Sequence, residues 1–149
     1  MATLPADIPT GIGDELGEPM RLYHYTCDHG LLGIGMRGEV LPPIKHDASV
    51  MARVGEEHAW LATVSWFTDL DRPSQAALGL TMRHGICNRT QYRYLVTEPL
   101  LLHRWTRVAK VFAPREDIEK LHYAVGAMPM HWYICAEAVP VVLDGTYRR

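Results

Sequence analysis

The sequence predicts an α+β fold with a mixed, mostly antiparallel sheet and short helices. Aromatic and β-branched residues are concentrated in several short stretches, as is typical of strands that cover a core. Short helical patterns separate these stretches, and none of the junctions carries the glycine-rich turn of a parallel dinucleotide-binding fold. The chain has 149 residues, enough for one domain with a substantial core.

The first elements are a strand, a helix and a second strand. Residues 21–26 (RLYHYT) alternate in character and are rich in aromatic side chains, which predicts a strand. Thr26 is expected to cap a helix over Asp28–Met36, and Gly38 is expected to end it. Residues 60–68 (WLATVSWFT) predict the second strand, which the turn sequence DLDRP stops.

The second half of the chain repeats this alternation of strands and helices. Both faces of the last segment are largely apolar, so we expect it to be a long, central strand. The expected elements are a helix over 74–84 that follows Pro73, a strand over 91–97, a mixed segment over 100–112, a helix from Pro114 to about Val125 and the terminal strand over 131–143.

Charge is unevenly distributed along the chain. Residues 1–19 hold four of the 17 acidic residues and no Lys or Arg. They are also rich in Pro and Gly and lack periodicity. We therefore expect a flexible segment at 1–19 and a single domain over 20–149. That domain carries 15 basic residues against 13 acidic ones, which leaves a local basic groove open. An odd cysteine count, no signal-peptide pattern and no apolar stretch of roughly 20 residues predict a cytoplasmic protein without membrane contact.

Two predicted strands carry polar residues where apolar ones would pack more easily. Alternation places His24 and Thr26 on one face of the first strand, and Glu137 is the one acidic residue in the apolar terminal strand. An ionised carboxylate in such a place needs a partner or a cleft. One interpretation is structural, with a hydrogen-bonded core histidine and a glutamate paired with an arginine at the sheet margin. The other is a binding site.

Together these motifs resemble the ADP-ribosyltransferase superfamily. The similarity is to members with a histidine on the first strand, an aromatic residue midway and a glutamate on a late strand. It rests on YHYT at 23–26, the following GLLGIGMRG at 30–38, WFTD at 66–69 and HWYICAEAVPV at 131–141. The DNA-modifying toxins of this superfamily have a similar opening strand. The resemblance spans about residues 21–143 and implies an ADP-ribosyltransferase-like fold.

The resemblance implies an enzyme that takes NAD as its substrate, cleaves the nicotinamide glycosidic bond and transfers ADP-ribose. Glu137 would be the catalytic carboxylate, because a negative charge stabilises an oxocarbenium-like ribosyl centre, with His24 as the second catalytic residue. An aromatic face would attract the cationic nicotinamide ring, and no metal is required. The residues expected to bind NAD are His24, Tyr25, Thr26, Trp66, Phe67 and Thr68.

The acceptor and the biological partners are less defined. Many members of the superfamily carry an acid or Gln two residues before the catalytic glutamate, where this chain has Cys135. Arginine-type protein acceptors are therefore less supported, and nucleic acid, other protein side chains and small molecules stay open. The resemblance also suggests a role in toxin or phage-defence biology, with an antitoxin or immunity protein as a partner.

Three other functions remain open from the residues alone. The first is a non-catalytic nucleotide-binding or inhibitor protein on the same fold, which would not need Glu137. The second is a metal site, for which six ligands are available, although two of them, His131 and Cys135, would lie about 13 Å apart along a straight strand. The six are Cys27, His29, His84, Cys87, His131 and Cys135. The third is a nucleophilic thiol at Cys27, activated by His24 or His29.

Overall fold

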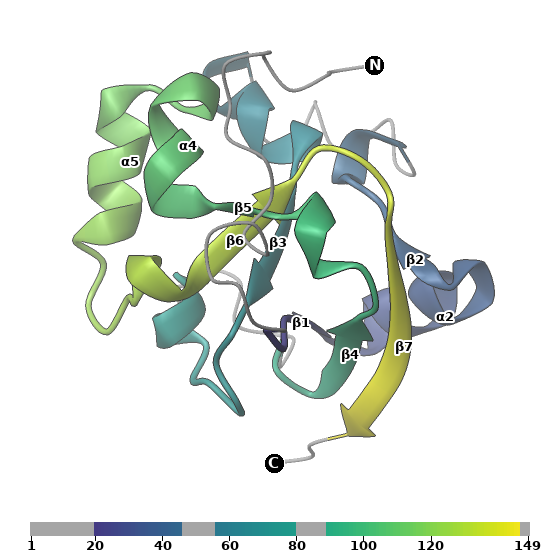
Figure 1. Cartoon of the computed structure of the whole chain (residues 1–149). Coiled ribbons are helices and arrows are strands. Elements are labelled where there is room, and N and C mark those ends of the chain that lie inside the picture. Colours follow the sequence, from purple (N-terminus) through teal and green to yellow (C-terminus); the bar gives the residue numbers. More distant parts are fainter. Residues whose placement is uncertain (1–19, 46–55, 80–88, 147–149) are drawn as a thin grey trace.

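The computed structural model describes residues 20–45, 56–79 and 89–146. Seven strands in these ranges form one sheet in the order β2-β7-β4-β1-β3-β6-β5, and every neighbouring pair is antiparallel (Figure 1). The α+β class and the antiparallel pairing are therefore confirmed, whereas the predicted flexible segment at 1–19 lies outside the described ranges. The strands are β1 (Tyr23–Thr26), β2 (Glu39–Val40), β3 (Ser65–Thr68), β4 (Tyr92–Val96), β5 (His103–Arg104), β6 (Trp132–Cys135) and β7 (Val139–Thr146).

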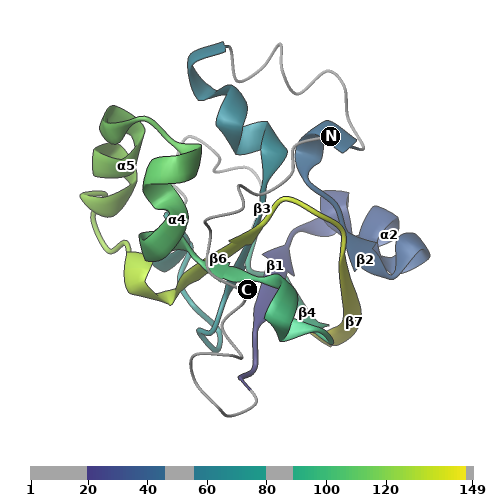
Figure 2. The ribbon, with the colours of Figure 1, turned by 45° about the horizontal axis from the view of Figure 1, so that its top comes forward.

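Short helices pack at the two ends of this sheet. Helices α4 and α5 lie together beside β5 and β6, whereas α2 lies at the opposite end, beside β2 (Figures 1 and 2). Within the described ranges, no helix combines the length and apolar character that a membrane crossing requires. The helices are α2 (Asp28–Arg37), α4 (Trp105–Phe112) and α5 (Arg115–His122), and the 3-10 turns are η1 (Pro43–Lys45), η2 (Glu56–Thr63), η3 (Ala76–Leu78), η5 (Pro99–Leu101) and η6 (Pro129–His131).

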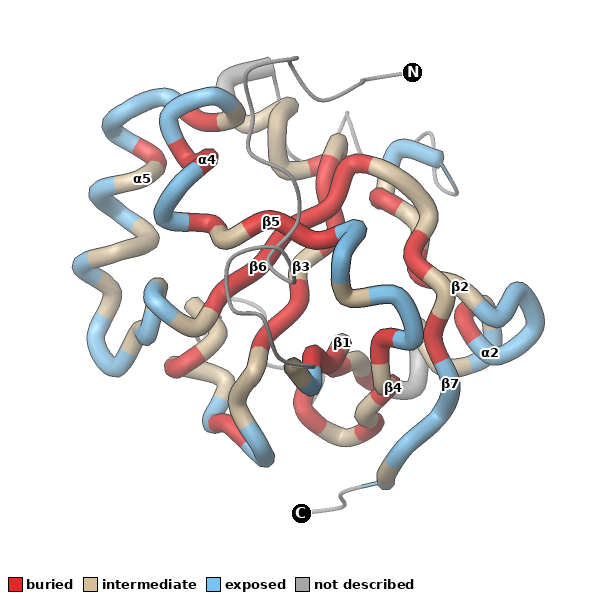
Figure 3. Tube along the Cα trace, in the orientation of Figure 1, coloured by how far each residue is buried: buried red, intermediate tan, exposed pale blue. Residues whose placement is uncertain are grey.

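The strand register divides the core into two clusters, one on each face of the sheet. We call the face that carries Leu22 and Phe67 the α2 face, because Ile34 of helix α2 joins its cluster. We call the other the tryptophan face, because Trp105 of α4 packs there against Trp132 and Ile134 of β6. Figure 3 shows a concentration of buried positions along β3 and β6.

The segment 131–143, expected as one long strand, is instead two strands. β6 ends at Cys135 and lies between β3 and β5, whereas β7 begins at Val139 and lies between β2 and β4. In the strand order β3, β1 and β4 stand between β6 and β7, yet the yellow ribbon joins the end of β6 to the start of β7 within a few residues (Figure 1). Glu137 lies in this crossover. The acid that interrupts the apolar pattern marks the place where the strand breaks.

Other boundaries also differ from the sequence-based expectation. Helix α2 begins at Asp28 and ends at Gly38, whose φ of 71° suits glycine, but its N-cap is Cys27 and not Thr26. The first part of the segment 60–68 belongs to the 3-10 turn η2, so only its last four residues form β3. The helix expected over 74–84 is a single 3-10 turn up to residue 79, beyond which the segment is not described.

Candidate functional site

The candidate site begins where strands β1 and β3 stop pairing. Their ladder contains one register pair, Tyr23 with Thr68, whereas β1 pairs with β4 along its whole length. Past that pair, the Trp66 carbonyl oxygen on β3 accepts a hydrogen bond of 2.7 Å from Nδ1 of His24. The His24 side chain thus donates to a carbonyl oxygen that would otherwise accept from a backbone amide of β1.

His24 is fixed and neutral in this position. Because a carbonyl oxygen only accepts, the imidazole proton lies on Nδ1, and Nε2 is left as an acceptor. Burial lowers the pKa of His24, against the opposing effect of the Trp66 carbonyl. The ring also packs at a tilt on Phe67, with centroids 5.4 Å apart. The result is an oriented hydrogen-bond acceptor, which can accept from a hydroxyl or amide donor.

A row of small polar side chains crosses the α2 face one step further along the strands. Ser65 pairs with Cys135 of β6, and continuing the β1–β3 register would bring Thr26 opposite Ser65. Thr26 is half-buried, and its hydroxyl donates a long hydrogen bond of 3.4 Å to the Cys27 carbonyl. Ser65 is 4% exposed, and its Oγ has no hydrogen-bond partner in the part of the chain that the structure describes. Such an orphaned hydroxyl costs free energy in a folded chain.

Glu137 follows this row in the β6–β7 crossover. It follows Cys135, a core residue of the α2 face, by two residues, and its backbone amide donates to the Cys135 Sγ at 3.4 Å. Its carboxylate forms an ion pair of 3.1 Å with Lys45 of η1. The carboxylate is half-exposed, so it is accessible from solution as well as paired. The predicted arginine partner is therefore a lysine.

The six residues predicted to bind NAD divide equally between the two faces. His24, Thr26 and Phe67 lie on the α2 face, on the same side as Glu137's neighbours in β6. Trp66 lies on the tryptophan face, where its ring packs on Trp105 with centroids 4.8 Å apart. The sheet thus separates Trp66 from His24, and Phe67 is the aromatic residue that the structure brings to this group.

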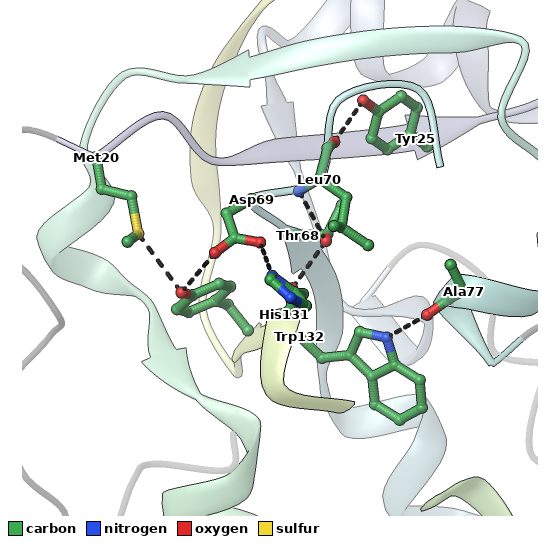
Figure 4. A network of polar contacts seen from close by, with 9 residues as sticks. Met20, Tyr25, Thr68, Asp69, Leu70, Ala77, His131 and Trp132 are labelled. Carbon is green, nitrogen blue, oxygen red and sulfur yellow. Dashed lines mark hydrogen bonds and ion pairs between the residues drawn. The ribbon is translucent and has the colours of Figure 1, made fainter. Parts of the chain in front are cut away.

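The hydroxyls of Tyr25 and Thr68 are already used within the fold. Tyr25 donates to the Leu70 carbonyl at 2.8 Å and accepts from the Arg72 amide. Burial raises the pKa of Tyr25. Thr68 is buried, donates to the His131 carbonyl and accepts from the Leu70 amide (Figure 4). Both side chains hold the turn after β3, which accounts for them without a ligand.

The same turn supports a carboxylate–imidazole pair at the other end of β3. Asp69 accepts from Nδ1 of His131 at 2.7 Å and from the Tyr133 hydroxyl at 3.2 Å (Figure 4). Burial, together with the Asp69 charge, raises the pKa of Tyr133 to about 12. Asp69 and His131 lie one position beyond the Thr68–Trp132 pair, so they join the ends of β3 and β6 far from Glu137.

The described residues give little support to the two other chemistries, a reactive thiol and a metal site. Burial raises the pKa of Cys135, which keeps this thiol protonated and unsuited to the role of a second acid. Cys27 is buried as the N-cap of α2, and the Nδ1 of His24 is engaged by Trp66. No group of three or more His, Cys, Asp or Glu in the described part of the chain could hold a metal ion. His84 and Cys87 lie outside it.

Two residues at this site, Ser65 and Lys45, were not singled out from the sequence. Ser65 stands in an aromatic strand, but one small polar residue in a strand gives no distinct signal. Lys45 lies 92 residues from Glu137, so only the fold brings them together. No protein-family model, curated protein or solved structure matches the chain.

Proposed function

We propose that the chain is an NAD-dependent ADP-ribosyltransferase-like enzyme. It cleaves the bond between the nicotinamide nitrogen and C1′ of the adjoining ribose, and an acceptor forms the new bond to C1′. Nicotinamide leaves as a neutral molecule, and the acceptor loses a proton. The acceptor class stays open between nucleic acid, protein and small molecules.

Each polar group of the α2 face has a role in this proposal. The Glu137 carboxylate stabilises the positive charge that develops on the ribosyl ring as the glycosidic bond lengthens. His24 presents Nε2 as an acceptor for a ribose hydroxyl, and Thr26 supplies a hydroxyl beside it. Phe67 supports the His24 ring and holds its orientation. These groups need no metal to perform their parts.

One observation carries the proposal: the pairing of β1 and β3 ends where these polar groups gather. A continuous ladder would satisfy both strands and leave no reason for His24 to reach the Trp66 carbonyl. An imidazole, two hydroxyls and a carboxylate on one side of a largely apolar sheet also exceed what packing requires. The order of His24, Phe67 and Glu137 along the chain agrees with the family resemblance.

The test is release of labelled nicotinamide from NAD by the wild type and by Glu137→Gln. The amide keeps the size of the side chain but cannot carry the charge, so we expect release to fall by roughly 100- to 1,000-fold. The free energy of unfolding should change by less than about 1 kcal/mol, because the Lys45 pair is partly exposed. Glu98→Gln, at an exposed glutamate before η5, is the matched control and should retain full activity.

Release that is equal in the wild type and Glu137→Gln would reject the catalytic role. A second function, a non-catalytic nucleotide-binding protein, is favoured by one feature: Lys45 already neutralises Glu137 without a ligand. It predicts that calorimetric titration detects NAD binding to both proteins and that neither releases nicotinamide. Absence of both binding and release in the wild type excludes both functions.

A further inference from the structure

We infer that Ser65 is a ligand-binding residue, whose hydroxyl donates a hydrogen bond to the ribose next to the nicotinamide. This inference deepens the proposed function and rests on it. It assigns a specificity-determining contact to a residue whose hydroxyl has no hydrogen-bond partner within the described ranges. It also predicts that the Ser65 hydroxyl has no hydrogen bond in the free protein and gains one when the ligand binds.

The first step of the argument is the environment of the hydroxyl. Ser65 is 4% exposed, and its Oγ has no hydrogen-bond partner among the described residues. A buried hydroxyl without a hydrogen bond destabilises the folded chain, and native proteins contain few of them. Alanine would fill almost the same space without this cost. The serine is therefore a candidate for a function outside folding.

The second step is a comparison with the other buried hydroxyl of the same strand. Thr68, at the opposite end of β3, is equally buried, but its hydroxyl both donates and accepts. The two residues point to opposite faces, since their positions differ by an odd number. On β3, the Thr68 hydroxyl on the tryptophan face is therefore hydrogen-bonded, whereas the Ser65 hydroxyl on the α2 face has no partner among the described residues.

The third step is the position of Ser65 relative to the proposed reaction. Ser65 pairs with Cys135, and Glu137 follows Cys135 by two residues. On its other side the row continues toward Thr26, where β1 no longer pairs with β3. A ribose whose 2′-hydroxyl binds Glu137 and whose ring lies toward His24 would pass over Ser65. A ribose oxygen is a suitable acceptor for an isolated hydroxyl donor.

The experiment compares Ser65→Ala with Thr68→Val in two measurements on the full chain. The first is the thermal unfolding temperature without ligand. We expect Ser65→Ala to be at least as stable as the wild type, because it removes an unsatisfied group, and Thr68→Val to be less stable, because it breaks two hydrogen bonds. The second is the dissociation constant for NAD by calorimetric titration. We expect it to rise roughly three- to tenfold in Ser65→Ala and to stay unchanged in Thr68→Val.

Each outcome has a defined meaning. Unchanged NAD affinity in Ser65→Ala overturns the assignment but leaves the proposed function standing. A clear loss of stability in Ser65→Ala also overturns it, since the hydroxyl would then have an internal role such as holding a buried water. No NAD binding by the wild type rejects both the proposed function and this contact. Ser65→Thr, which restores a hydroxyl, should recover part of the affinity relative to Ser65→Ala.

Discussion

At the scale of single residues, burial keeps two histidines neutral. His24 donates from Nδ1 to the Trp66 carbonyl, whereas His122 accepts at Nε2 a hydrogen bond of 2.9 Å from the Trp105 indole. Burial lowers the pKa of both. An added proton would give His122 a second donor facing the indole donor, so protonation is incompatible with this contact.

These two side chains predict how stability depends on pH. Because their folded-state pKa values lie below the usual value of about 6.5, the unfolded chain binds protons first as the pH falls. The free energy of unfolding should therefore decrease from pH 7 to pH 5. His24→Asn keeps a donor for Trp66 and His122→Gln keeps an acceptor for Trp105, but neither amide titrates. Urea unfolding at pH 7, 6 and 5 should show a shallower decrease in each variant and the shallowest in the double variant. An unchanged slope in the double variant contradicts this assignment.

At the scale of elements, the junction of β1 and α2 determines where Thr26 lies. Gly30, in the first turn of α2, is so close that a Cβ there would lie 2.1 Å from the Thr26 Oγ1. Gly35, one and a half turns later, would place a Cβ at an ordinary 3.6 Å from the Tyr94 hydroxyl. The same helix thus contains one glycine that the fold requires and one that it tolerates.

These two glycines give a matched pair of substitutions. Gly30→Ala should destabilise the chain by about 1–3 kcal/mol and weaken NAD binding, because the Thr26 hydroxyl must turn away. Gly35→Ala should stabilise it by about 0.5–1 kcal/mol, since alanine is the better helix former, and should leave NAD binding unchanged. Denaturant unfolding and calorimetric titration measure both effects. Equal NAD affinity in the two variants would exclude Thr26 from the ligand-binding group.

Elements of strong local pattern were predictable, and those set by tertiary contacts were not. The alternating run at β4 and the Pro114 start of α5 contain their own signals, and both lie where the sequence predicts them. The break between β6 and β7 is different, because apolar residues continue on both sides of Glu137 and only the strand order shows the crossover. The 3-10 turn η2 likewise replaces the first part of the strand predicted over 60–68, and Trp60 in this turn donates to Asp117 of α5.

At the scale of the whole molecule, the two faces of the sheet carry different kinds of side chains. The four tryptophans gather on one face, where Trp60 and Trp66 pack on the fully buried Trp105 and Trp132 packs on Trp66. The other face carries the neutral imidazole, the orphaned hydroxyl and the acid of the crossover. Alternation predicted which residues share a face, but not which face α4 and α5 would cover. The sequence therefore predicted residues of the candidate site together with Tyr25, Trp66 and Thr68, whose contacts lie within the fold.

Neighbouring aromatic residues on β3 test this separation directly, since Trp66 and Phe67 point to opposite faces. Trp66→Phe should destabilise the chain by about 1–2 kcal/mol, because it thins the tryptophan layer, and should leave the KM for NAD unchanged. Phe67→Leu should cost a similar amount of stability but raise the KM roughly two- to tenfold, because the His24 ring loses its aromatic support. Initial rates of nicotinamide release over a range of NAD concentrations measure both. A KM that rises in Trp66→Phe and not in Phe67→Leu would place the ligand on the tryptophan face and remove the basis for assigning His24, Ser65 and Glu137 to one site.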